Sequence, residues 1–148
     1  MNKVQKKSPL PDREQENLLV VLKKAQEKFG YVPEEFLVET AKSMNTSIGE
    51  AYGVATFYSF LSTRPLGRNV IRICQSLPCY LNNSEMIIKS VGDEIGIKPG
   101  ETTPDGRFSF ELTNCIGECD KAPAMLINNN VHGDLTPEKI SQILQEYK

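Results

Sequence analysis

The 148-residue chain contains no tryptophan, a single histidine (His132) and no glycine-rich phosphate-binding loop. It therefore has few residues of the kinds that support hydrolysis or nucleotide binding. No apolar run approaches the ~20 residues of a transmembrane helix, and a formal net charge of −2 offers no basic surface for nucleic acid. With 39% hydrophobic residues, the chain is predicted to be soluble and globular, with one ordinary core or two small ones.

All four cysteines lie in two close pairs, Cys74 with Cys79 and Cys115 with Cys119. Four thiolates suit a structural zinc ion, whose ligand pairs are commonly two to four residues apart. They also suit a [2Fe-2S] cluster, in which each of two irons takes two protein ligands. Disulfides are a weaker alternative, because nothing near the N-terminus resembles a signal peptide and the cysteines are not dense. Any chemistry is therefore expected on sulfur, in a reducing, cytoplasmic setting.

The residues before each pair predict a strand. Asn69–Cys74 is a β-branched run, and Phe108–Thr113 alternates apolar and polar residues with period two. If these strands are parallel, both cysteine pairs leave the sheet at one end. Gly117 lets the backbone come close to a bulky inorganic ligand. This context favours a [2Fe-2S] cluster, while zinc and redox-active thiols remain open on spacing alone.

The first third of the chain predicts three helices. Residues 13–29 carry apolar side chains at helical spacing, and Pro33 suits the first turn of a second helix. Ser47 and Glu50 form a capping box, which starts a third helix. Residues 1–12, with three lysines and two prolines, are expected to be a mobile or extended lead-in.

The third helix is rich in aromatic and small residues. Tyr52, Phe57 and Tyr58 are predicted to pack in the core of a helical bundle, with a subunit interface as the alternative. Residues 61–68 then break the helical pattern with Pro65 and Gly67. The chain is therefore predicted to comprise a helical subdomain, residues 1–66, and a second domain, residues 67–148.

The second domain is predicted to be a small α/β sandwich. Asn83 or Ser84 is predicted to cap a helix that ends at Gly96. Asparagines 128–130 predict a hairpin between two short strands, because asparagine tolerates left-handed conformations. Thr136 and Pro137 then start a closing helix. The order β-α-β-β-β-α is that of a thioredoxin-type domain.

Several motifs together resemble one family, the thioredoxin-like [2Fe-2S] ferredoxins. They are YVPEE at residues 31–35, AYGVATFY at 51–58, IKPGETTPDGRF at 97–108, LTPEK at 135–139 and the C-x4-C and C-x3-C pairs. The family includes the small iron–sulfur subunit of the NADH-oxidising module of respiratory complex I. It also includes the matching subunit of NAD(P)-linked hydrogenases and formate dehydrogenases.

The resemblance implies that Cys74, Cys79, Cys115 and Cys119 ligate a [2Fe-2S] cluster. It also implies an N-terminal helical bundle followed by a thioredoxin-like α/β domain. The partner it implies is a larger subunit that holds FMN, NAD(P)H and a [4Fe-4S] cluster. In that setting the chain would be part of an oxidoreductase, yet it would carry electrons without catalytic residues or a substrate site of its own.

The leading functional expectation is an electron-transfer subunit of an electron-bifurcating or NAD(P)-reducing hydrogenase in the cytoplasm. Such a chain would lie in one complex with a flavin subunit and a larger hydrogenase or dehydrogenase subunit. The equivalent subunit of complex I or of a formate dehydrogenase is the alternative. From a different class, a zinc-stabilised interaction module is the rival, and a dithiol oxidoreductase is weaker because neither pair is C-x-x-C.

Charged residues in the second cysteine loop depart from the family pattern. Glu118 and Asp120 are expected to lower the reduction potential, because reduction adds an electron to an already anionic centre. Alternatively, they face solvent or a lysine of the partner. In the first loop, Leu77 and Pro78 are expected to set the loop shape or to shield the cluster. His132 is not expected to be a ligand, since four cysteines complete the set.

Overall fold

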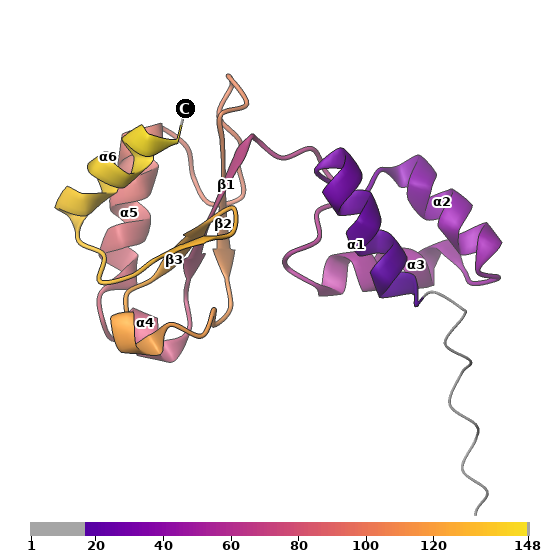
Figure 1. The fold of residues 1–148 in the computed structure, drawn as a ribbon, viewed down its shortest axis with the longest axis horizontal. Coiled ribbons are helices and arrows are strands. Elements are labelled where there is room, and N and C mark those ends of the chain that lie inside the picture. The colour runs from indigo at the N-terminus through magenta and orange to yellow at the C-terminus, as the bar shows by residue number, and fades with distance from the viewer. Residues whose placement is uncertain (1–16, 148) are drawn as a thin grey trace, which may run out of the picture. The chain divides into compact units, whose positions relative to one another are not determined.

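The computed structural model describes residues 17–147, which divide into two compact units between Arg64 and Pro65 (Figure 1). The expected lead-in at residues 1–12 and the start of the first predicted helix at residues 13–16 lie outside the described residues. Within residues 17–147, no helix is long and apolar enough to span a bilayer.

The first unit contains three helices, α1 (Leu18–Phe29), α2 (Glu34–Ser43) and α3 (Ile48–Phe57). Helix α1 begins at Leu18 because Asn17 is its N-cap, and the Asn17 side chain accepts a hydrogen bond from the amide of Leu19 at 3.0 Å. The helices enclose a small core of apolar residues: Leu22, Ala25, Val32, Leu37, Ala41, Ala51 and Ala55.

Helix α3 is capped largely as the sequence predicts. The Ser47 hydroxyl oxygen accepts from the Glu50 amide at 3.1 Å, which is the first half of a capping box. The second half differs, because the Glu50 carboxylate accepts from the Thr46 hydroxyl at 2.6 Å. The N-terminal turn is therefore held by both residues that precede Ile48.

The aromatic residues around α3 lie on the outside of the unit. Tyr52, Phe57 and Tyr58 are 52%, 80% and 41% exposed, so the prediction that they form the bundle core is wrong. The physical reason is that Ala51 and Ala55 provide the buried side of α3, which lets this helix lie close to its neighbours. The larger side chains are left on the solvent side.

The second unit is built on a four-stranded mixed sheet. Its strands are β1 (Asn69–Cys74), β2 (Phe108–Thr113), β3 (Met125–Ile127) and β4 (Asn130–His132), in the order β2-β1-β3-β4. Strands β1 and β2 are parallel, whereas β3 is antiparallel to both β1 and β4. The α/β fold class is confirmed, and the predicted β-α-β-β-β-α order holds except for an additional short helix and a 3₁₀ turn.

Helices α5 (Ser84–Ile95) and α6 (Pro137–Glu146) lie on the same side of this sheet (Figure 1). Between helices and sheet lies an apolar core made of Ile71, Ile73, Ile87, Val91, Phe108, Phe110, Met125, Ile127, Leu135, Ile140 and Leu144. The hairpin between β3 and β4 turns at Asn128, whose φ of 56° is left-handed, as the sequence predicts.

Helix starts in this unit differ from the predictions in detail. Asn83 is the N-cap of α5, but it has φ 64° and makes no side-chain capping bond. Thr136 likewise precedes α6 without a side-chain capping bond. The sequence pattern also missed a four-residue helix, α4 (Leu77–Tyr80), and a short 3₁₀ turn, η1 (Cys119–Lys121).

Candidate metal centre

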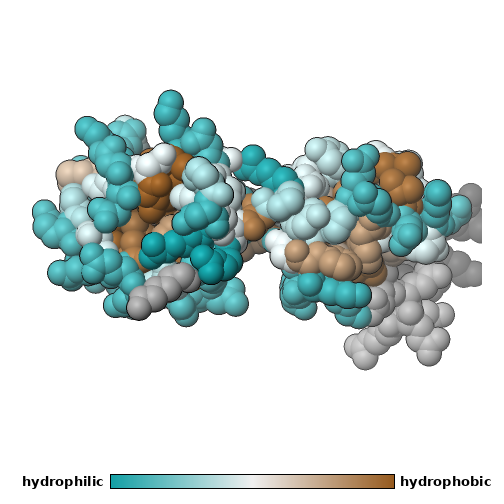
Figure 2. All heavy atoms as spheres, turned by 90° about the horizontal axis from the view of Figure 1, so that it is seen from above, coloured by the Kyte–Doolittle hydropathy of each residue, from teal (hydrophilic) through white to brown (hydrophobic). Residues whose placement is uncertain are grey.

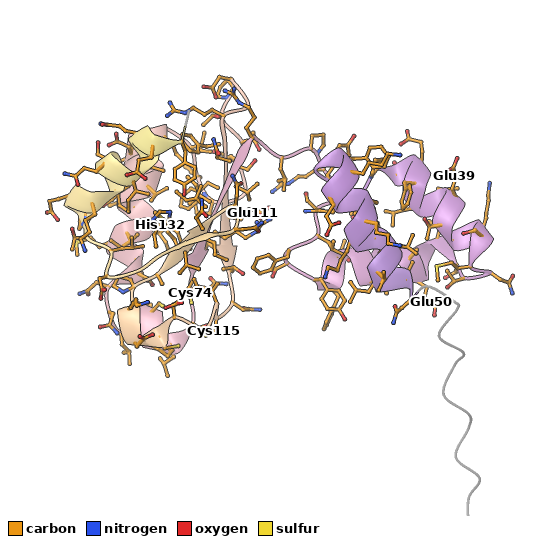
Figure 3. All side chains as sticks on the ribbon, in the orientation of Figure 1. Glu39, Glu50, Cys74, Glu111, Cys115 and His132 are labelled. Carbon is orange, nitrogen blue, oxygen red and sulfur yellow. The ribbon has the colours of Figure 1, made fainter. Side chains whose placement is uncertain are left out.

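Two of the four cysteines follow the same end of the two parallel strands. Strand β1 ends at Cys74, which pairs in register with Thr113 at the end of β2. Cys115 comes two residues after Thr113, and Figure 3 shows Cys74 and Cys115 together at this end of the sheet. The parallel arrangement therefore brings segments 41 residues apart in the sequence to one place.

Helix α4 (Leu77–Tyr80) contains Cys79 and places its thiol within hydrogen-bonding reach of Cys74. Ser76 is the N-cap of this helix, and its carbonyl accepts from the amide of Tyr80 at 3.0 Å. Pro78 lies in the first turn, where the missing amide hydrogen costs nothing. Cys74 and Cys79 are 1% and 2% exposed, so the first pair is buried.

The second pair lies in a tight loop at the surface. Gly117 has φ 93°, a conformation that side-chain-bearing residues disfavour, and it reverses the chain between Cys115 and Cys119. The two sulfur atoms are 3.6 Å apart, and both residues are exposed. A tetrahedral metal with bonds of ~2.3 Å holds two thiolate sulfurs ~3.8 Å apart, so this pair has the spacing for one shared metal.

Hydrogen bonds converge on the sulfur of Cys74. Burial acts to raise the pKa of this thiol, but the backbone amides of Ser76 and Ile116, the Cys79 thiol and the Ser76 hydroxyl donate to its sulfur. Together they lower the pKa below its usual value. Donors aimed at a ligand sulfur also stabilise negative charge on a bound cluster.

The other two perturbed thiols have raised pKa values. Burial, and then the hydrogen bond with Cys74, raises the pKa of Cys79, against an amide hydrogen bond from Ala124. The contact with Cys115, and then burial, raises the pKa of Cys119. Cys119 also interacts electrostatically with Cys74 and Cys79, so the two pairs lie within reach of each other's charge.

The four thiols lie as two pairs, which can serve either a zinc ion or a [2Fe-2S] cluster. In residues 17–147, no three His, Cys, Asp or Glu side chains surround a point suited to one metal ion. A tetrahedral zinc would need four sulfurs around one point, whereas a [2Fe-2S] cluster needs two sulfurs at each of two irons.

The charges of the second loop are partly paired within the chain. Lys121 Nζ lies 3.3 Å from Glu118 Oε2, and this contact raises the pKa of Lys121. The lysine that faces Glu118 is therefore the chain's own, where the sequence suggested solvent or a partner's lysine. Asp120 is exposed.

Sequence reasoning missed Ser76, whose amide and hydroxyl both donate to Cys74. The sequence feature that could have indicated this role is the position of Ser76 between Cys74 and a turn that contains Pro78. His132 lies in β4, away from the labelled cysteines (Figure 3). Its Nε2 is 2.9 Å from the Tyr147 hydroxyl, and burial lowers its pKa.

Comparison with known proteins supports a [2Fe-2S] centre. The family model for thioredoxin-like [2Fe-2S] ferredoxins matches residues 1–148. The E subunit of the NADH-quinone oxidoreductase of Escherichia coli K12 is 42% identical over 127 residues, which cover 86% of this chain and 76% of the relative. HndA, a subunit of the NADP-reducing hydrogenase of Solidesulfovibrio fructosivorans, is 36% identical over 138 residues, covering 93% of this chain and 80% of the relative.

A solved structure with a similar fold is that of an NAD⁺-reducing [NiFe]-hydrogenase in the air-oxidized state. The TM-score is 0.71 at 23% identity, and the match covers 86% of this chain but 22% of the hydrogenase chain. At this identity the likeness concerns the fold.

Proposed function

Because the chain belongs to the thioredoxin-like [2Fe-2S] ferredoxin family, we propose that it is an electron-transfer subunit that exchanges electrons with the flavin subunit of an NAD(P)H-linked oxidoreductase. The observation that carries the proposal is the meeting of the two cysteine pairs at one end of β1 and β2. The cluster characteristic of this family supplies one-electron chemistry.

Each cysteine pair holds one iron in this proposal. Cys74 and Cys79 are the ligands of one iron, and Cys115 and Cys119 are the ligands of the other. The 3.6 Å sulfur separation in the second pair supports this assignment. Residues 1–66 are then the helical subdomain and residues 67–148 the [2Fe-2S] domain, in keeping with a division between Arg64 and Pro65.

The two pairs have different roles beyond ligation. The buried pair, with amide and hydroxyl donors on Cys74, anchors the centre to the sheet and shields it from water. The exposed pair presents the other iron to a partner at the surface. This asymmetry suits a carrier, since an electron must enter or leave through one accessible edge.

The complex we propose is a cytoplasmic NAD(P)-reducing or electron-bifurcating hydrogenase, with FMN, NAD(P) and a [4Fe-4S] cluster on the partner subunit. In its favour, HndA, a subunit of an NADP-reducing hydrogenase, is a relative at 36% identity over 138 residues. Complex I is the second candidate, because several relatives are E subunits of NADH-quinone oxidoreductases.

The test is to reconstitute electron transfer from NADH or NADPH. The chain is co-expressed with its candidate flavin subunit, and the visible absorbance of the cluster is followed anaerobically after the nucleotide is added. The absorbance should fall within seconds when the flavin subunit is present and should not change when it is absent. A cluster that dithionite reduces but neither nucleotide reduces through the flavin subunit contradicts the proposal.

A further inference from the structure

Two opposite charges lie inside the sheet, close to its cysteine-bearing end. Arg72 of β1 and Glu111 of β2 are partners in the parallel register. Arg72 Nε lies 3.0 Å from Glu111 Oε2, and the two side chains are 8% and 18% exposed. The register pair two residues further on is Cys74 with Thr113. A positive and a negative charge are therefore held in the protein interior near a proposed ligand.

Alternation along the strands decides which side of the sheet the two charges face. Ile71 and Phe110 belong to the apolar core between the sheet and the helices α5 and α6. Successive side chains of a strand point to opposite faces, so Arg72, Cys74 and Glu111 share the other face. Residues two apart in a strand are separated by ~7 Å along the chain. The charges therefore lie on the Cys74 side of the sheet and at short range from its thiol.

The burial of Arg72 distinguishes it from the other charged residues. Figure 2 shows hydrophilic residues, in teal, around the outside of the second unit, which is drawn on the left. Within residues 17–147, Arg72 is the one charged residue that is buried. Salt screens interactions between exposed charges strongly, but it screens buried charges much less. The Arg72 and Glu111 charges therefore act on their surroundings more strongly than exposed charges at the same distance.

Stability alone does not require this ion pair. Removal of two charges from water costs free energy that their attraction only offsets, and an apolar pair in the same place is often equally stable or more stable. The adjacent register pair, Ile73 with Leu112, shows that these two strands accept apolar partners. Charges at this position therefore call for an explanation other than stability.

The position of the pair gives it an effect on electron transfer. Reduction adds one negative charge to a centre that its four thiolate ligands already make anionic. A positive charge nearby favours the reduced form, and a negative charge nearby opposes it. The Arg72 guanidinium by itself would therefore raise the reduction potential, and the Glu111 carboxylate acts against that rise.

We propose that Arg72 and Glu111 form a charge pair that sets the reduction potential of the cysteine-ligated centre. In this pair, Glu111 is the counter-charge that keeps Arg72 from raising the potential. The inference rests on the proposed function, because it needs a cluster at the four cysteines. It adds two residues that lie outside both cysteine loops and that the cysteine spacing does not indicate.

The test compares Glu111→Gln with Glu111→Asp in the full chain purified with its cluster, by anaerobic redox titration followed by EPR. Glutamine keeps the side-chain length and removes the charge, whereas aspartate keeps the charge and shortens the side chain. A unit charge ~10 Å away, at an effective dielectric constant of ~20, changes the ratio of reduced to oxidised cluster on the order of tenfold. Glu111→Gln should therefore raise the potential by ~59 mV, which is tenfold in this ratio. Glu111→Asp should change the ratio less than ~threefold.

Arg72→Met should shift the potential downward, because it removes the positive charge and leaves the Glu111 carboxylate. A loosened sheet would move the potential of both single variants in the same direction, so opposite signs separate the electrostatic effect from a structural one. Glu94→Gln is the matched control, because it removes the same formal charge from an exposed residue at the end of α5 away from α4. It should change the ratio less than ~twofold.

The outcomes separate this inference from the proposed function. If the unmodified chain holds no cluster, the proposed function fails and this inference falls with it. If the cluster is present, only this inference is overturned when Glu111→Gln shifts the potential no more than Glu94→Gln, or when Arg72→Met shifts it upward. If Glu111→Gln loses the cluster, the sign of the Arg72→Met shift decides. Loss of the cluster from both variants overturns the inference and leaves a purely structural pair.

Discussion

A buried ion pair joins the two strands that lead to the cysteines. Arg72 of β1 and Glu111 of β2 are direct partners in the parallel register, with Arg72 Nε 3.0 Å from Glu111 Oε2. Their side chains are 8% and 18% exposed. We predict that removing either charge alone destabilises the sheet strongly and loosens the end where Cys74 and Cys115 meet.

The magnitude follows from the distance and the burial. At 3.0 Å and an effective dielectric constant of ~20, two unit charges attract by ~5–6 kcal/mol, most of which offsets their desolvation. Loss of one partner leaves the other charge buried, which typically costs ~3–5 kcal/mol. Glu111 keeps some exposure, so we expect Glu111→Leu and Arg72→Met each to cost ~3 kcal/mol.

The assay is urea unfolding of the full chain followed by far-UV circular dichroism, with both single variants and the double variant. In the double variant no buried charge of this pair remains, so its free energy of unfolding should lie within ~1 kcal/mol of the unmodified chain. Single variants that cost less than ~1 kcal/mol, or a double variant as unstable as the sum of the two, would refute the reasoning.

Three further predictions concern the metal centre. Replacement of any one of the four cysteines by alanine should reduce the bound iron and sulfide, and a variant that keeps the full complement of both contradicts the ligand set. Glu118→Gln should raise the reduction potential, because it removes negative charge near a centre that becomes more anionic on reduction; a redox titration without an upward shift counts against this role. Ser76→Ala should lower the reduction potential, because the hydrogen bond from the Ser76 hydroxyl to Cys74 is lost. A hydrogen bond with a net contribution of ~1 kcal/mol corresponds to a shift of ~40 mV for one electron. An unchanged potential would show that the hydroxyl does not tune the centre.

Local sequence patterns predicted the strands well. The bounds of β1 and β2 agree with the β-branched run and the alternating run, since both signals depend on residues that are adjacent in the chain. The sequence did not predict whether β1 and β2 are parallel. Their relative direction depends on the path of the connecting segment that contains α5, which is a tertiary feature. The cysteine spacing predicted the candidate ligands but left zinc open, and it is the match to the [2Fe-2S] ferredoxin family that favours a cluster.

The errors have physical causes as well. The sequence pattern places Tyr52 and Phe57 in the core because apolar character does not say which side of a helix is buried, and the small Ala51 and Ala55 provide that side in the structure. Helix α4 is too short for a helical period to appear in the sequence. The Glu118–Lys121 pair is an i, i+3 contact that local spacing could have predicted.

EPR spectroscopy of the anaerobically purified chain, with iron and zinc analysis of the same sample, tests the central claim most directly. After dithionite reduction, the account predicts an axial or rhombic spin-one-half signal with the two irons of a [2Fe-2S] cluster per chain, and loss of that signal in Cys74→Ala. Stoichiometric zinc without such a signal, in a preparation that preserves clusters, would contradict the account and leave a structural zinc module in its place.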